Sequence, residues 1–142
     1  MSEEFANCAS MTLRRAARQI SQFYDRKLQQ GGLRNTQFSL LVMLRYLEPV
    51  SISELAEHLG MDRSTLTRNA KLLAQNALIE ERPSEDGRVR LLALTEDGQS
   101  AVDELAPMWR EAQQDFLARF GADRWERLRA ELRAVEELIS KS

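Results

Sequence analysis

The 142-residue sequence predicts a mainly α-helical protein with one small β-hairpin, an α+β arrangement. Apolar residues recur at helical spacing along most of the chain. Between residues 78 and 94, two short apolar runs instead flank the turn dipeptide Asp86-Gly87, which is typical of a hairpin. Six predicted helices and this hairpin account for nearly the whole sequence.

Composition indicates an ordinary soluble globular protein, with 43% hydrophobic and 30% charged residues. The longest apolar run, residues 40–44, is far shorter than the roughly 20 residues of a membrane-spanning helix. Glu3 and Glu4 lie where a secretory signal would be positively charged, and the single cysteine, Cys8, has no partner for an internal disulfide. We therefore expect a cytoplasmic protein without a membrane partner.

The first long helix is predicted from about residue 10 to residue 30, where Gly31 and Gly32 end it. Its apolar stripe comprises Leu13, Ala17, Ile20 and Tyr24. A second helix begins near Asn35 or Thr36, either of which would cap it, and stops before Pro49. Its buried face is predicted to comprise Phe38, Leu41, Val42 and Leu44.

A helix, a tight turn and another helix come next. Ser51-Ile-Ser-Glu54 matches a capping box and opens a short helix that ends before Gly60. Asp62 is predicted to cap the following helix, which reaches about residue 76. The inward residues of that helix are predicted to be Leu66, Ala70, Leu72 and Leu73. Two strands, residues 78–83 and 89–94, complete the hairpin.

Two long helices end the chain. Thr95-Glu-Asp-Gly98 starts the first, which Gly121 ends, and Asp123-Arg-Trp-Glu126 is a capping arrangement for the second. Apolar residues of the last helix step alternately by three and four, as in a short heptad seam. We predict a dimer interface formed by Leu13, Ile20, Trp125, Leu128, Leu132, Val135 and Ile139. Alternatively, the first helix covers this seam within one subunit.

Positive charge is concentrated locally, although the net charge is −2. No acidic residue lies between Arg63 and Ile79. The second helix of the helix-turn-helix is therefore basic and polar on its outer face. Arg68 would chelate a guanine edge and Asn69 an adenine edge. The candidate DNA-binding residues here are Arg63, Ser64, Thr65, Thr67, Arg68, Asn69 and Lys71. The alternative is a solvated helix face.

The hairpin tip carries further candidates, Asp86, Arg88 and Arg90. A narrow minor groove has an enhanced negative potential that attracts an inserted arginine, the role predicted for Arg88. Asp86 would hold the tip by accepting from the guanidinium or from the turn backbone. Arg90 contacts phosphate or only makes the strand edge soluble. Together with the preceding helices, this pattern is that of a winged helix-turn-helix.

The chain resembles the MarR family of winged-helix regulators over almost its whole length. The resemblance rests on the wing Asp86-Gly-Arg88, on Leu91-Leu-Ala-Leu-Thr95 with Gly98, and on Asp62-Arg-Ser-Thr-Leu-Thr-Arg68, which is similar to the family's recognition helix. It implies a single domain, residues 1–142, with a DNA-binding lobe over residues 36–95 and a helical dimerisation region over residues 9–31 and 96–142. It also implies a homodimer that binds a pseudo-palindromic operator in double-stranded DNA.

The resemblance further implies repression relieved by a small aromatic or anionic effector. Candidate effector-binding residues on helices that would line the crevice between the lobes are Arg14, Arg18, Phe23, Phe38, Tyr46 and Trp109. The apolar members are alternatively simple core. Cys8 suggests redox sensing, because some family members sense peroxides through a first-helix cysteine. The chain departs from their pattern, since Thr12 lies one turn after Cys8 and Tyr24 is distant, and the alternative is an inert cysteine in a mobile N-terminal segment.

Other chemistry is not indicated. With one histidine, His58, and no cysteine pair, the sequence predicts no metal site and no cofactor. There is no nucleophile–base pattern and no glycine-rich phosphate loop, so we predict that the protein is not an enzyme. The alternative to a DNA-binding regulator is a winged-helix module that binds another protein and not DNA.

Overall fold

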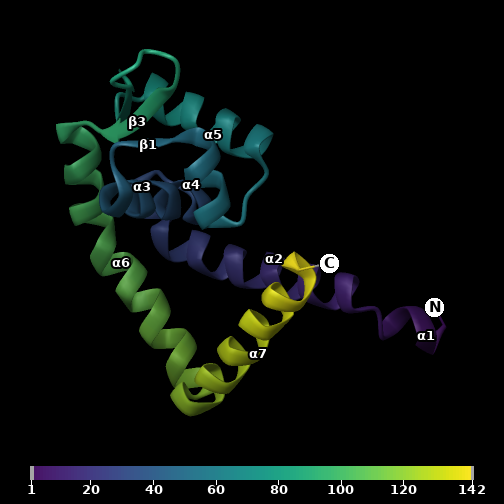
Figure 1. Cartoon of the computed structure of the whole chain (residues 1–142). Helices are drawn as coiled ribbons and strands as arrows, with labels where there is room; N and C mark the ends of the chain where they lie inside the picture. The colour runs from purple at the N-terminus through teal and green to yellow at the C-terminus, as the bar shows by residue number, and fades with distance from the viewer. Residues whose placement is uncertain (1, 142) are drawn as a thin grey trace.

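A computed structural model describes residues 2–141, and Figure 1 shows how the elements are arranged. The helices are α1 (Glu3–Ala6), α2 (Ala9–Leu28), the short 3-10 helix η1 (Gln29–Gly31), α3 (Asn35–Leu47), α4 (Ile52–Leu59), α5 (Arg63–Gln75), α6 (Glu96–Phe120) and α7 (Ala122–Ser140). The strands are β1 (Val50–Ser51), β2 (Ile79–Pro83) and β3 (Arg90–Leu94). This is the mainly α protein with a small β-hairpin that the sequence predicts.

The described residues form a compact lobe with long helices extending from it. In Figure 1, α3, α4, α5 and the strands lie together, α6 leaves this lobe as a long rod, and α7 turns back from its far end. The sheet is antiparallel in the order β1-β3-β2, with Val50 opposite Leu92 and Ile79 opposite Leu94. None of the helices described for residues 2–141 is both long and apolar enough to traverse a bilayer.

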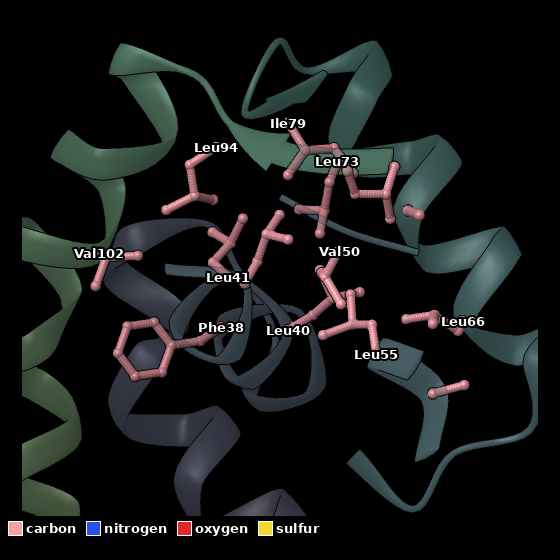
Figure 2. Packing of buried hydrophobic residues seen from close by; sticks show 14 of the residues in the cluster. Phe38, Leu40, Leu41, Val50, Leu55, Leu66, Leu73, Ile79, Leu94 and Val102 are labelled. Atoms are coloured by element: carbon pink, nitrogen blue, oxygen red, sulfur yellow. The ribbon is translucent and has the colours of Figure 1, made fainter. Parts of the chain in front are cut away.

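The hydrophobic core lies where α3 passes beneath the sheet. Figure 2 shows side chains from α3, α4, α5 and the strands converging on this helix. Burying such leucines stabilises the lobe by about 1.5–3 kcal/mol per side chain relative to exposure. The fully buried large residues are Leu28, Leu40, Leu41, Leu44, Leu55, Leu66 and Leu73. The lobe that carries the hairpin is therefore held together by a continuous apolar core.

Two predictions about the core were wrong in detail. Val42 is only half-buried, whereas Leu40, which was not predicted, is fully buried because α3 is covered on several sides. Leu72 is 48% exposed. Each helical residue turns by about 100°, so Leu72 lies well away from the stripe that Leu66, Ala70 and Leu73 bury.

Several element ends also differ from prediction. Asn35 and Thr36 do not cap α3, because Arg34 is the N-cap residue and the Asn35 N–H donates to an Asp25 carboxylate oxygen at 2.7 Å. Asp62 occupies the N-cap position of α5 without a capping side-chain hydrogen bond. The last helix begins at Ala122, so Asp123 lies inside its first turn. The elements α1 and β1 were not predicted, and both predicted strands begin one residue later than expected.

Candidate nucleic-acid interface

Local sequence sets the placement of α5. The Ser51 hydroxyl accepts from the Glu54 N–H at 3.2 Å, as the capping box predicts, and α4 then ends at Gly60. Gly60 has a φ of 62°, a left-handed conformation that suits glycine and lets the chain reverse before α5. The inner residues of α5 are anchored in the core. Its outer residues face solvent.

The outer face of α5 carries the residues predicted to bind DNA, and α5 is called the reading helix below. Thr65 and Asn69 are half-buried, and the exposed members are Arg63, Ser64, Thr67, Arg68 and Lys71. No carboxylate lies on this helix. The structure thus brings all seven candidates onto one helix and leaves three cationic side chains in solvent. Such a face is complementary to DNA phosphates and base edges.

Hydrogen bonds within α5 restrict what these side chains offer to a base. Asn69 Nδ2 donates to the Thr65 carbonyl at 3.2 Å, so one of its two amide hydrogens is already used. The Thr67 hydroxyl donates to the Arg63 carbonyl at 2.8 Å and is left with its acceptor lone pairs and its methyl group. One Arg68 nitrogen lies 3.3 Å from Thr65 Oγ1, and its other N–H groups stay available.

The wing tip is a self-contained hydrogen-bonded loop. The same Asp86 carboxylate oxygen accepts from the Arg88 N–H at 3.0 Å and from the Ser84 hydroxyl at 2.8 Å. Ser84 Oγ accepts in turn from the Val89 N–H at 3.2 Å. The hydrogen bond from the Arg88 backbone, followed by that from Ser84, lowers the pKa of Asp86. Asp86 thus binds the turn backbone, one of its two predicted partners.

Arg88 and Arg90 differ from the remaining arginine of the wing. Arg82 pairs with Glu80 on the same strand, with 2.8 Å between Arg82 Nη2 and Glu80 Oε1. The guanidinium groups of Arg88 and Arg90 are exposed, and among residues 2–141 the structure gives them no acidic partner. Their positive charges are therefore available to a phosphate backbone or to a groove.

The predicted effector residues do not come together. Phe38 is part of the core, and Tyr46 is 81% exposed on α3. The Phe23 ring lies edge-on to the Tyr24 ring. The Arg119 guanidinium carbon lies over the Phe23 ring, 5.5 Å from the ring centroid. Trp109 is partly exposed on α6, and Arg14 and Arg18 are exposed on α2. A surface cavity of about 380 Å³ lies at the corner between α2 and α3, and none of the six candidates lines it.

The predicted dimer residues lie largely uncovered. Leu13, Leu128, Val135 and Ile139 are exposed, and Ile20, Trp125 and Leu132 are half-buried. Trp125 contacts Phe116 edge-to-face, with 5.5 Å between ring centroids, and so ties α7 to the end of α6.

Cys8 is half-buried at the N-cap of α2. Within residues 2–141 no group of three or more metal-ligating side chains occurs.

Sequence and structure comparisons identify the family to which this fold belongs. A family model for the MarR family matches residues 33–89. The curated relatives include the uncharacterised HTH-type transcriptional regulator YwoH of Bacillus subtilis, 29% identical over 108 residues, 76% of this chain and 79% of that protein. The organic hydroperoxide resistance transcriptional regulator of B. subtilis is 32% identical over 93 residues, 62% of this chain and 63% of that protein.

A solved structure agrees over nearly the whole chain. The Mycobacterium tuberculosis transcriptional regulator MosR, in complex with DNA, is 36% identical with a TM-score of 0.85, and the match covers 95% of this chain and 98% of that one. The fold and the basic outer face of α5 therefore define a winged helix-turn-helix DNA-binding transcriptional regulator. The chain belongs to the MarR family. That family consists of DNA-binding regulators and not of enzymes.

Proposed function

We propose that the protein is a cytoplasmic repressor that binds a pseudo-palindromic operator as a homodimer and releases it when a small effector binds. The observation that carries the proposal is the uncompensated positive surface formed by Arg63, Arg68 and Lys71 on α5 and by Arg88 at the wing tip. A helix of this kind enters a major groove, and an arginine at a wing tip reaches the adjacent minor groove.

The homodimer is supported by the amount of exposed surface. The chain exposes 10397 Å². A folded monomer of 16.3 kDa exposes about 7,500 Å². Part of the excess is apolar and belongs to α7, where Ile139 is 64% exposed, so the first helix does not cover the seam within one subunit. A second copy is the covering partner we propose, and two-fold symmetry would set the reading helices about 34–36 Å apart.

The effector site would be completed by dimerisation. Arg14, Arg18 and Phe23 lie on α2 and Trp109 lies on α6, which pack against each other and leave exposed surface toward a second subunit. The arginines would pair with a carboxylate or phenolate and the rings with an aromatic body. We leave Phe38 and Tyr46 out of this proposed site, since the first is core and the second faces solvent.

Selection of bound sequences from a random pool of DNA duplexes tests the proposal. We expect a symmetric site, tight binding that weakens steeply with salt, and release by an aromatic acid. Arg68→Ala should relax the base preference at one position of each half-site. A purified protein that is monomeric and passes through a heparin column at low salt would contradict the proposal. That result would instead favour a protein-binding module.

Redox control is a second candidate. It is favoured by the similarity to the organic hydroperoxide resistance regulator and by the position of Cys8 at the start of α2, next to the proposed interface. A hydroperoxide would oxidise the thiol to a sulfenic acid and would itself be reduced to the alcohol. Wild type and Cys8→Ser should then differ in operator release by an organic hydroperoxide. Equal release from both proteins would exclude this route.

A further inference from the structure

A chain of polar contacts joins the end of α3 to the first turns of α6. Arg45 Nε donates to Gln99 Oε1 at 2.8 Å, and Arg45 Nη2 donates to the Gln99 carbonyl at 2.8 Å. The same Nη2 also donates to an Asp103 carboxylate oxygen at 3.0 Å. The Arg45 guanidinium thus donates hydrogen bonds to both the side chain and the backbone of Gln99 on α6.

Gln99 passes this contact on to the sheet. Gln99 Nε2 donates to Glu48 Oε1 at 3.2 Å, and Glu48 Oε2 accepts from the Leu94 N–H at 2.6 Å. Strand β1 pairs with Leu91 and Leu92 of β3, so the Leu94 N–H lies beyond its end. The Glu48 carboxylate therefore takes the place of a strand partner at the base of the wing.

A separate set of contacts fixes the start of α6 to the segment between α5 and β2. The Thr95 hydroxyl donates to the Ala77 carbonyl at 2.6 Å, and the Thr95 N–H donates to the Leu78 carbonyl at 3.1 Å. Gly98 packs against Leu78 so closely that an added Cβ would lie 2.0 Å from the Leu78 oxygen. Together with the Arg45 contacts and the burial of Val102 and Leu105 in the core, these contacts fix the direction in which α6 leaves the lobe.

The direction of α6 matters because its second half contacts α2 and leads into α7. Lys27 of α2 forms an ion pair with Glu111 at 3.2 Å, and the Tyr24 hydroxyl donates to Gln113. In Figure 1, α6 is the rod that connects the lobe with α7. A change of angle where α6 meets the lobe would therefore move the reading helix relative to α7, whereas α2 is also attached to the lobe directly through the buried Leu28.

The members of this network differ in weight. Asp103 has a side chain that is 73% exposed, so its ion pair with Arg45 contributes little. Gln99, Arg45 and Glu48 are half-buried, and their hydrogen bonds compete less with water. None of the three lies on α5 or on the wing tip, so none is expected to contact DNA.

We propose that Arg45, Glu48 and Gln99 are positioning residues that set the angle between the DNA-binding lobe and α6. They thereby set the spacing at which a dimer presents its two reading helices. The inference rests on the proposed homodimer and operator, and it adds the residues that tune the half-site spacing.

The test compares Gln99→Met with Gln114→Met. The first substitution removes both polar groups of Gln99 without changing charge or length greatly, and the second makes the same change at an exposed site of the same helix. Each protein is titrated with the selected palindrome, with versions one base pair longer and shorter, and with a duplex that holds one half-site. Thermal unfolding confirms that each variant is folded at the assay temperature.

We expect Gln99→Met to bind the palindrome about fivefold more weakly and to lose much of its preference for the natural spacing. Its single half-site binding should be unchanged, and Gln114→Met should match wild type. Arg45→Lys, which keeps the charge but loses the forked geometry, should show the same change of spacing preference. Spin labels at Gln75→Cys, in a Cys8→Ser background, should report a broader distance between the two reading helices in Gln99→Met.

Two results overturn the positioning role alone. One is an unchanged spacing profile in Gln99→Met and Arg45→Lys. The other is an equal loss for the palindrome and for the single half-site, which indicates a damaged DNA-binding lobe. If wild type itself binds one half-site as tightly as the palindrome, the proposed dimeric function fails, and the positioning role fails with it.

Discussion

Asp86 holds Arg88 by its backbone, because the carboxylate accepts from the Arg88 N–H at 3.0 Å and leaves the guanidinium in solvent. The carboxylate that orders the turn therefore does not neutralise the charge that the turn presents. Without this separation of roles, an acid two residues from the proposed groove-binding arginine would weaken its attraction to phosphate.

Arg88→Ala is expected to weaken DNA binding by about 1–3 kcal/mol with an unchanged free energy of unfolding, because the side chain is exposed. Arg82→Ala is the matched control, since it removes the same charge from the same wing but from an arginine already paired with Glu80. Anisotropy titration of both variants against one duplex measures the difference. Equal losses would mean that only net charge matters.

Asp86 is expected to titrate below its ordinary pKa of 3.8, because two hydrogen bonds stabilise the carboxylate. A lowered folded-state pKa means that the contribution to wing order is fully present above pH 3.8 and is lost as the pH falls through the lower folded value. The Arg88 amide resonance should therefore stay constant from neutral pH down to the region of pH 3.8 and shift only below it. A midpoint above this value would show that the Asp86 contact does not form in solution.

Tyr24→Phe is expected to destabilise the fold by about 1 kcal/mol, because it removes the hydrogen bond to Gln113 that joins α2 to α6. Burial raises the pKa of Tyr24 above 10.0. The protonated form is thus favoured in the fold, and its contribution is complete below pH 10.0 and declines as the pH rises through the higher folded value. Urea unfolding of both proteins at neutral and alkaline pH checks this. A wild type no more sensitive to alkali than the variant would contradict it.

Gly98→Ala is expected to destabilise the protein by about 1–3 kcal/mol, because the new methyl group would meet the Leu78 carbonyl oxygen at 2.0 Å. Ser100→Ala is the control, as it makes an exposed change in the same turn of α6. Denaturant unfolding with both variants measures the cost. A neutral Gly98→Ala would mean that the backbone around Leu78 shifts easily to make room for the methyl group.

Much of the fold follows from local signals that act over a few residues. The Ser51 and Thr95 caps form as expected, and Gly60 and Gly87 adopt the left-handed conformation that their turns require. These features depend on hydrogen bonds and backbone freedom within one turn, so a short stretch of sequence contains all the information needed to predict them.

The rest depends on contacts between distant segments. From the sequence, the position of Glu48 before Pro49 indicates the end of a helix and nothing more. Only the tertiary fold brings its carboxylate to the Leu94 N–H of β3. The sequence predicts that both leucines of the pair Leu72 and Leu73 are core residues. Helix geometry places Leu73 on the buried stripe and leaves Leu72 exposed. The role of Tyr46 is similarly decided by tertiary packing, since an aromatic residue beside a buried stripe is exposed when no neighbouring element covers it.

The uneven distribution of charge along the chain has a consequence for how the molecule approaches DNA. Residues 91–142 contain 11 acidic and 7 basic side chains, whereas the reading face of α5 contains only basic ones. Much of the acidic excess lies at the start of α6, where Glu96, Asp97, Asp103 and Glu104 are exposed and residues 91–109 contain no basic side chain. In Figure 1, α6 begins at the left of the lobe and α5 lies at its right. A polyanion is repelled from the first side and attracted to the second, so the lobe is turned before contact and arrives with α5 toward the DNA.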